Sequence, residues 1–354
     1  MRPEAAFAIP GDIQTRTGGY IYERRMLESL NALGQPTRHI ELMTSWPNPT
    51  PEAERDLVEK LAALPQDMPL ILDGLVFGAM DTAVLAAQSR PVVAMLHHPL
   101  GLEAGLAPDR AAELLAREAA NLRHAAHVVV PSPHTREILV QDFGVQQADI
   151  SIALPGFDRP AMRAIAKADP PLILSVGIIC ERKGHDVLLD ALARVAHLDW
   201  QAAIVGMVHD AAVQDRLLHQ RARLGLEARV RFTGVIPPEE LDQLYQQASV
   251  FALATRYEGY GMVLSEAQLY GLPVLSCTVG AVPQTVPPGS GILVPPDNAD
   301  KFATALSSLL QDDALRQSYG AQSAAIGARL PQWTDTARVM QAALRHVQTS
   351  TVPK

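Results

Sequence analysis

Short apolar runs alternate with longer stretches of helical periodicity along most of this chain. A run such as LILSVG at residues 172–177 is continuous rather than alternating, which is typical of a parallel strand buried on both faces. The stretches between the runs repeat apolar residues every three or four positions and predict helices. The sequence therefore predicts an α/β protein with parallel sheets covered by helices on both faces. The expected strands are residues 5–9, 71–73, 92–96, 127–130, 172–177, 202–206, 230–234, 250–254 and 273–277.

The alternation falls into two blocks, separated by the segment 154–171, which is rich in Pro, Gly and charge. With 354 residues, the chain is long enough for two domains that each bury a core. We predict two Rossmann-like, doubly wound domains facing across a cleft, 1–158 and 171–330, joined by a linker at 159–170. Residues 331–354 are expected to form a C-terminal helix that crosses back to the first domain.

Composition limits the class of protein. The chain carries 30 Lys and Arg against 38 Asp and Glu, a formal net charge of −8, and only two cysteines. This balance argues against a nucleic-acid partner, and two distant cysteines are no disulfide framework. No apolar stretch approaches the roughly 18 residues of a membrane span, and residues 1–12 lack the apolar core of a signal peptide. We expect a cytoplasmic protein, at most peripheral to the inner membrane, because Arg24 and Arg25 would contribute only about 2 kcal/mol there.

The most informative motif is RYEGYGMVLSEAQLYGLPVLS at residues 256–276, directly after an expected strand. A Gly-Tyr-Gly turn opens a helix, whose first amides are unpaired and carry about half a positive charge, which suits a phosphate or a sugar hydroxyl. Glu258 lies at the turn. Glu266, about two helical turns on, can accept hydrogen bonds from the vicinal hydroxyls of a ribose. Isolated glutamates are usually ordinary surface residues, but the turn, the strand before it and the Gly-Leu-Pro after it all agree with a ligand site.

The two glutamates, followed by Gly-Leu-Pro-Val-Leu, resemble the signature of the retaining nucleotide-sugar glycosyltransferases of family 4, which have the GT-B fold. The resemblance covers most of the chain and is most specific in the second domain. Further similar segments are SVGIICERKGHDVLLDAL (175–192), VRFTGVIPPEELDQLYQQASVFAL (230–253), GSGILVPPDNADKFATAL (289–306), REAANLRHAAHVVVPSPHTREIL (117–139) and LPGFDRP (154–160).

The resemblance implies roles for residues of the second domain. Glu266 matches a glutamate that contacts the nucleotide ribose, and Glu258 matches one beside the donor sugar. Lys183 matches a lysine that pairs with the diphosphate, although a lysine at a helix start can also be an ordinary surface residue. The turn whose amides hold the sugar and diphosphate corresponds to Gly261, Met262 and Val263.

One position departs from the family pattern. Where an Arg usually follows the Val-Gly at the end of the strand, this chain has Ile178. Arg182 lies next to Lys183 and is a candidate donor-binding replacement, so either Arg182 supplies the second cation or that contact is missing. Cations at this place would stabilise the leaving diphosphate without a metal.

In the first domain the resemblance implies donor-side roles for Gly18 and Gly19, in the loop after the first strand, and for His97. A Gly-Gly turn is also a common helix start, and a single His after a strand is often structural. Here a second histidine, His98, and then a proline follow at the carboxyl edge of the expected sheet, which favours a functional His97.

Two other post-strand residues stay open from the sequence. Ser132 is either close to a ligand or structural, and Asp73 is either a ligand or a helix cap. His97 and His98 have no third partner at ligand spacing, so we expect no metal site and no cofactor. Neither a G-x-S-x-G elbow nor a P-loop is present, which argues against those hydrolases and NTPases.

Together these features predict transfer of a hexosyl group from a nucleotide-diphosphate sugar to an acceptor hydroxyl. By resemblance the configuration is retained, with Lys183, Glu258 and His97 catalytic. No carboxylate nucleophile is evident, so a diphosphate oxygen is expected to take the acceptor's proton. The acceptor, on the side of domain 1–158, is a small molecule, a saccharide or a lipid-linked group. The alternatives are another GT-B enzyme, such as a phosphorylase or a sugar-nucleotide epimerase, and a non-catalytic nucleotide-sugar-binding subunit.

Overall fold

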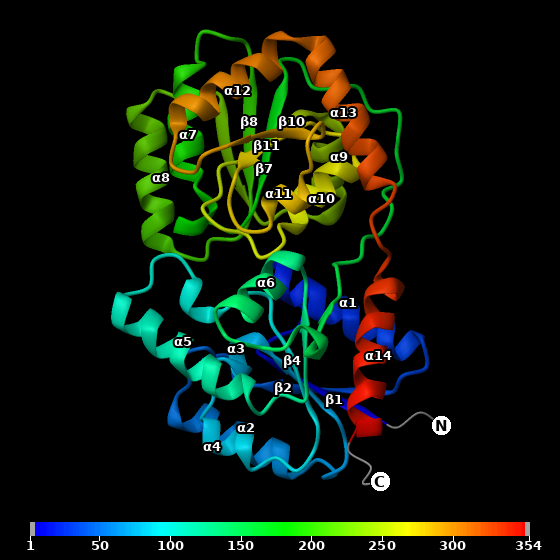
Figure 1. Cartoon of the computed structure of the whole chain (residues 1–354). Helices are drawn as coiled ribbons and strands as arrows, with labels where there is room; N and C mark the ends of the chain where they lie inside the picture. The colour runs from blue at the N-terminus through cyan, green and yellow to red at the C-terminus, as the bar shows by residue number, and fades with distance from the viewer. Residues whose placement is uncertain (1–3, 351–354) are drawn as a thin grey trace. The chain divides into compact units, whose positions relative to one another are not determined.

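A computed structural model describes residues 4–350 of the chain, which form two compact units (Figure 1). Unit 1 contains the chain up to Phe157 and again from Pro331 onward, and unit 2 is Asp158–Leu330. Each unit contains one six-stranded sheet. All strand pairs in both sheets are parallel, so every consecutive pair of strands needs a crossover, and helices supply most of them.

The sheet of unit 1 has the strand order β2-β1-β3-β4-β5-β6. Its strands are β1 Ala5–Pro10, β2 Thr37–Leu42, β3 Leu70–Asp73, β4 Val92–Met95, β5 His127–Val130 and β6 Ile150–Ile152. Its helices are α1 Gly18–Ala32, α2 Pro51–Ala62, α3 Gly74–Phe77, α4 Thr82–Ala86, α5 Pro108–Leu122, α6 Pro133–Gln141 and α14 Trp333–Ser350, with short 3₁₀ turns η1 Leu100–Leu102 and η2 Gln147–Asp149.

The last helix, α14, follows unit 2 in the sequence but packs in unit 1. Its first residue, Trp333, is buried and meets the Tyr22 ring of α1 edge-on, with centroids 5.8 Å apart. The Thr336 hydroxyl donates to the Leu154 carbonyl at 2.8 Å. The Trp333 ring thus packs the start of α14 against α1, and the Thr336 hydroxyl ties it to the segment after β6 (Figure 1).

The sheet of unit 2 has the order β12-β11-β10-β7-β8-β9. Its strands are β7 Leu172–Val176, β8 Gln201–Val205, β9 Val230–Gly234, β10 Ala248–Leu253, β11 Val274–Cys277 and β12 Gly291–Val294. Its helices are α7 His185–Arg194, α8 Ala211–Arg223, α9 Pro238–Gln247, α10 Met262–Leu269, α11 Val282–Thr285, α12 Ala299–Gln311 and α13 Asp313–Gly327, with a 3₁₀ turn η3 Glu181–Lys183.

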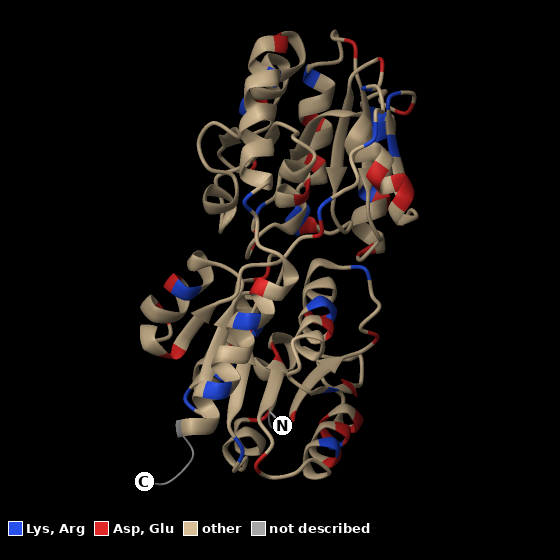
Figure 2. Ribbon diagram, turned by 90° about the vertical axis from the view of Figure 1, so that its right-hand side faces the viewer, with Lys and Arg blue, Asp and Glu red and all other residues tan. Residues whose placement is uncertain are grey.

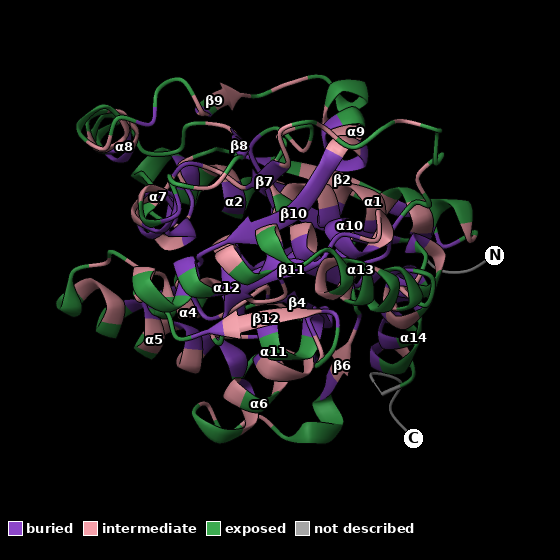
Figure 3. Ribbon diagram, turned by 90° about the horizontal axis from the view of Figure 1, so that it is seen from above, coloured by how far each residue is buried: buried purple, intermediate pink, exposed green. Residues whose placement is uncertain are grey.

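The nine strands expected from apolar runs are confirmed, whereas β2, β6 and β12 were missed. All three are sheet edges. An edge strand is covered on fewer sides, so it carries polar residues: β2 reads TRHIEL and is exposed at two positions. Figure 3 shows the same contrast in unit 2, with β10 buried and the edge strands β9 and β12 only partly so. In Figure 2 the Lys, Arg, Asp and Glu residues lie mainly on helices and loops, away from the strands.

Candidate functional site

In unit 2, two loops meet at the carboxyl edge of the central strands. β7 and β10 are hydrogen-bonded neighbours, η3 follows β7, and the Glu258 turn follows β10. Residues more than 70 positions apart are thereby brought together: the Arg256 amide donates to the Arg182 carbonyl at 2.8 Å. Carboxyl ends of parallel strands are where open α/β sheets bind ligands.

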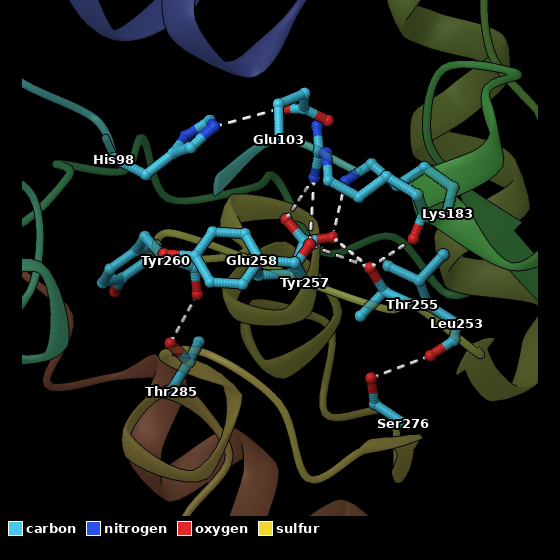
Figure 4. Close-up of polar contacts among 11 residues, drawn as sticks. His98, Glu103, Lys183, Leu253, Thr255, Tyr257, Glu258, Tyr260, Ser276 and Thr285 are labelled. Atoms are coloured by element: carbon cyan, nitrogen blue, oxygen red, sulfur yellow. Dashed lines mark hydrogen bonds and ion pairs between the residues drawn. The ribbon is translucent and has the colours of Figure 1, made fainter. Parts of the chain in front are cut away.

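Lys183 and Glu258 form a buried ion pair at this edge (Figure 4). The Lys183 ammonium lies 2.6 Å from Glu258 Oε1, and the two side chains are 9% and 6% exposed. The Thr255 hydroxyl donates to the same oxygen at 2.9 Å. Arg182 approaches the other oxygen at 3.5 Å and donates to the Tyr257 carbonyl at 3.0 Å. Arg182 thus joins Lys183 on one carboxylate.

The charges in this cluster do not cancel. Burial by itself would raise the pKa of Glu258, but Lys183, Arg182 and the hydrogen bonds from Lys183 and Thr255 outweigh it and hold the pKa below its usual value. Glu258 is therefore ionised at neutral pH. Two cations facing one carboxylate leave an excess of one positive charge, which suits an anionic ligand.

A glycine lets the Lys183 turn lie against β10. Gly184 follows Lys183 with φ +61°, and a Cβ there would be 2.0 Å from the Ala254 carbonyl oxygen. Any other residue would push the turn away from the strand end, so the ion pair depends on this glycine.

Helix α10 begins beside Glu258. Gly261 precedes it with φ +84°, and no side chain caps this helix. The first turn, at Met262 and Val263, also contains no acidic residue. Its amides are therefore available to an external acceptor.

Glu266 lies further along α10 and is held by an aromatic stack. The Tyr245 hydroxyl donates to Glu266 Oε2 at 2.9 Å, and the Tyr245 ring lies face to face with Tyr270 at 4.8 Å. Burial raises the pKa of Glu266, while Tyr245 and the charge of Lys183 oppose the rise. One carboxylate oxygen is thus fixed in place, and the other is available to a ligand.

In unit 1 the residues that the sequence singled out also lie together. Helix α1 begins at Gly18, and a Cβ on Gly19 would be 3.7 Å from His97 Nε2. His97 follows β4, so the glycine loop and the histidine meet at the carboxyl edge of this sheet.

Two buried carboxyls accompany His97. Glu23 and Asp73 are each 2% exposed, and donor atoms of Glu23, Asp73 and His97 lie within 4.8 Å of one another. Burial raises the pKa of Glu23 to about 7, and burial together with Glu23 raises that of Asp73 well above its usual value. Burial lowers the pKa of His97.

Sequence reasoning missed Glu23. It lies on the buried face of α1 with Met26 and Leu30, and a glutamate on an apolar helical stripe was the available signal. The sequence offers no third partner at ligand spacing for His97 and His98, and the fold brings Glu23 and Asp73 to His97 from distant parts of the chain.

The remaining post-strand residues have structural partners. The Asp73 carboxylate caps α3 by accepting from the Leu75 amide at 2.9 Å, one of the two interpretations that the sequence left open. Ser132 caps α6 through the Thr135 amide at 3.1 Å. His98 pairs with Glu103 at 2.9 Å.

Comparison with known families identifies the chain. The model of glycosyl transferases group 1 matches residues 158–325, and that of glycosyltransferase family 4 matches residues 70–159. The chain belongs to the family 4 glycosyltransferases. Within residues 4–350, no helix combines the length and the apolar character needed to cross a membrane.

Curated relatives of this family member match over about half of the chain or a little more. D-inositol 3-phosphate glycosyltransferase of Corynebacterium aurimucosum is 37% identical over 183 residues, 49% of this chain and 44% of that protein. The enzyme of the same name from Nocardia farcinica is 34% identical over 235 residues, 60% of this chain and 52% of its own length. The matched stretch therefore spans about half the length of these relatives.

Solved structures show the GT-B fold. Sucrose-phosphate synthase from Thermosynechococcus elongatus has a TM-score of 0.84 at 23% identity, over 99% of this chain and 100% of that one. Anabaena HepE, in complex with UDP and glucose, has a TM-score of 0.75 at 19% identity, over 98% and 100% of the two chains. The expected two-domain α/β fold is confirmed.

Proposed function

We propose that this family member transfers a hexosyl group from a nucleotide-diphosphate sugar to an acceptor hydroxyl, with retention of configuration. The observation that carries the proposal is the buried cluster of Lys183, Arg182 and Glu258, which has an excess positive charge beside the open N-terminus of α10. Family membership supports the same reaction.

Lys183 and Arg182 carry the charge stabilisation. As the bond from the sugar C1 to the phosphate oxygen breaks, negative charge grows on the diphosphate, and preorganised cations lower the energy of that state. Arg182 supplies the second cation that Ile178 does not. These two side chains take the place that a metal ion has in other transferases, so the diphosphate needs no metal.

Neighbouring groups would orient the donor. The α10 amides at Gly261, Met262 and Val263 would bind the sugar and diphosphate, and Glu266 would accept from the ribose hydroxyls. Glu258, which pairs with Lys183 and Arg182, would lie beside the donor sugar. In unit 1, the Gly18–Gly19 loop and His97 would contribute to the donor side.

Retention follows if the acceptor attacks from the face of the leaving group. The bond from the sugar C1 to the diphosphate oxygen breaks, a bond from C1 to the acceptor oxygen forms, and the acceptor's proton passes to the diphosphate. The relatives are named as glycosyltransferases and, in one case, as the mannosylfructose-phosphate synthase of Agrobacterium fabrum. The acceptor of this chain is a small molecule, a saccharide or a lipid-linked hydroxyl.

The test is a binding panel with UDP, GDP, ADP and dTDP, followed by donor turnover with the matching nucleotide sugars. UDP comes first, since HepE was solved with it. Arg182→Ala should weaken nucleoside diphosphate binding about 10-fold or more, because a hydrogen bond to a charged group contributes about 1.5–3 kcal/mol, and should leave binding of the bare nucleoside unchanged. The matched control is Arg216→Ala, an exposed arginine that pairs with Glu181.

Two results would contradict the proposal. One is a panel in which no nucleoside diphosphate binds. The other is binding of a nucleotide sugar without release of nucleoside diphosphate to water or to any acceptor, which would support the non-catalytic subunit. If NMR shows that the product has an inverted anomeric centre, only the retention of configuration would be wrong, and the transfer itself would stand.

A further inference from the structure

Glu23, Asp73 and His97 come together from three separate elements of unit 1. Glu23 projects from α1, and Asp73 ends β3, paired in register with Met95 of β4. His97 follows two residues after Met95. The neighbouring strands β3 and β4 therefore deliver a carboxylate and an imidazole to one point, and α1 adds the second carboxylate.

The charge of this cluster is not balanced by a basic side chain. Within the described residues, the charged neighbours of Glu23 are Asp73 and His97, and no Lys or Arg pairs with it. Two carboxyl groups that are both 2% exposed cannot remain ionised side by side unless a positive charge joins them. A bound cation meets this requirement, and so does a proton shared in the side-chain hydrogen bond between Glu23 and Asp73.

Two buried atoms of the cluster have no hydrogen-bond partner, Glu23 Oε1 and His97 Nε2. They lie 3.6 Å apart, which is too long for a hydrogen bond between them. The separation is close to the about 3.4 Å between two ligands that each lie about 2.1 Å from a tetrahedral metal ion. Buried polar atoms are rarely left unpaired, so a cation between them accounts for both.

Neighbouring contacts also hold Asp73 and His97 in place. Asp73 accepts from the Leu75 amide, which fixes its carboxylate. The His97 ring packs edge-on against Tyr22 at 5.3 Å, and the Thr135 hydroxyl donates to the His97 carbonyl at 3.2 Å. Such supporting contacts hold a site in shape. The His97 side chain is 27% exposed, so one side of the cluster is open to a water or a substrate oxygen.

We propose that Glu23, Asp73 and His97 form a binding site for one divalent transition-metal cation in unit 1. One imidazole and two carboxylates are a donor set for Zn²⁺ or a similar ion, whereas Mg²⁺ and Ca²⁺ prefer oxygen ligands alone. Three protein ligands leave a fourth position open. The test of this site measures Zn²⁺ binding and not transfer, so the site can fail separately from the proposed donor-side role of His97.

The experiment uses the full chain after removal of metals with a chelator. Zn²⁺ binding is measured by competition with a chromophoric chelator, and Co²⁺ is added separately to record the visible spectrum of the bound ion. We expect one Zn²⁺ per chain and a Co²⁺ spectrum of low coordination number. Zn²⁺ at about 100 times its Kd should also raise the unfolding temperature, through about 2.7 kcal/mol of added stability.

Variants locate the bound ion. Glu23→Gln and Asp73→Asn keep the side-chain shape and should each weaken Zn²⁺ binding well over ~10-fold, since even the loss of supporting contacts costs about 10–100-fold. His98→Ala is the matched control, because His98 is the next residue but pairs with Glu103. It should bind Zn²⁺ like the parent chain.

Three results would overturn the proposal: no stoichiometric Zn²⁺, Zn²⁺ affinity unchanged in both carboxyl variants, or affinity lost in His98→Ala alone. The second and third would assign the ion to surface histidines. In any of these cases the two carboxyls share a proton instead, and Glu23→Gln would stabilise the chain above pH 7 with or without metal. If either carboxyl variant fails to fold, the Co²⁺ spectrum of the parent chain still decides, since tetrahedral and octahedral ions differ in intensity.

Discussion

The two units place opposite charge balances at the carboxyl edges of their parallel sheets. In unit 2, two cations and one carboxylate meet after β7 and β10. In unit 1, two carboxyls and one imidazole meet after β3 and β4. Glu23 and Glu258 are both at least 95% buried, yet burial raises the pKa of Glu23 to about 7 whereas Lys183 and Arg182 outweigh burial and hold that of Glu258 low.

The difference teaches that the fold sets the location of a site and the neighbouring charges set its ligand. Burial opposes ionisation in both units, and the neighbouring cations and hydrogen bonds decide which carboxyl is charged. An excess positive cluster selects an anion such as a diphosphate, and a pair of uncompensated carboxyls selects a cation or a proton. Three further measurements test this contrast.

The largest effect is expected where a buried charge pair is broken. Lys183→Ala leaves Glu258 buried without its nearest cation and should lower the free energy of unfolding of unit 2 by about 3–5 kcal/mol. Denaturant unfolding without nucleotide measures the change.

Two further variants separate charge from packing at this pair. The double variant Lys183→Met, Glu258→Gln should recover most of the unfolding free energy that Lys183→Ala loses. It leaves no buried carboxylate without its cation. Lys301→Ala, an exposed lysine at the start of α12, is the control and should change stability little. A Lys183→Ala chain as stable as the parent would mean that Glu258 is not held ionised by this pair.

Glu118, another buried carboxyl of unit 1, should make stability depend on pH in the opposite direction to Glu258. Burial raises the pKa of Glu118 to about 8, against the single hydrogen bond from the Leu100 amide at 3.1 Å. Between about pH 4.5 and 8 the folded chain holds a proton that the unfolded chain has lost, so unfolding free energy falls as pH rises. Glu118→Gln should remove that fall, on the order of 3 kcal/mol between pH 5 and 8.

Unfolding at pH 5 and pH 8 measures the Glu118 effect. Glu113→Gln is the matched control, because Glu113 lies on the same helix but is exposed. Glu258 adds nothing in this window, since its lowered pKa matters only as pH falls below about 4.5. An unchanged slope in Glu118→Gln would mean that Glu118 is ionised in the folded chain.

The smallest effect concerns the support of Glu266 by Tyr245. Tyr245→Phe removes one neutral-donor hydrogen bond, about 0.5–1.5 kcal/mol, and should weaken nucleotide binding roughly 3- to 10-fold. The loss should be greater for UDP than for 2′-deoxy-UDP if Glu266 binds the ribose. Tyr270→Phe keeps the stacked ring and loses only the bond to Asp242, so it is the control. Equal losses for both nucleotides would point to a packing effect.

Eight of the nine apolar runs found the central strands, which the sequence could predict because they are buried, and the ninth found the edge strand β9. The edge strands β2 and β6 were missed because they mix polar with apolar residues. The edge strand β12 reads GILV and was missed although its residues are apolar. The unit 2 residues were predictable for a similar reason. Glu258, Gly261 and Glu266 lie within nine consecutive residues, and a local turn and helix bring them together.

By itself the sequence determined the α/β class, the two blocks and the motif at residues 256–276, since these depend on local periodicity and turn chemistry. Only the tertiary structure decided that Arg182 reaches the same carboxylate as Lys183, and that Glu23 and Asp73 join His97. These contacts depend on the order of the strands in each sheet, which places distant segments of the chain side by side. The charge state of each group follows in turn, because burial and neighbouring charges exist only once the chain has folded.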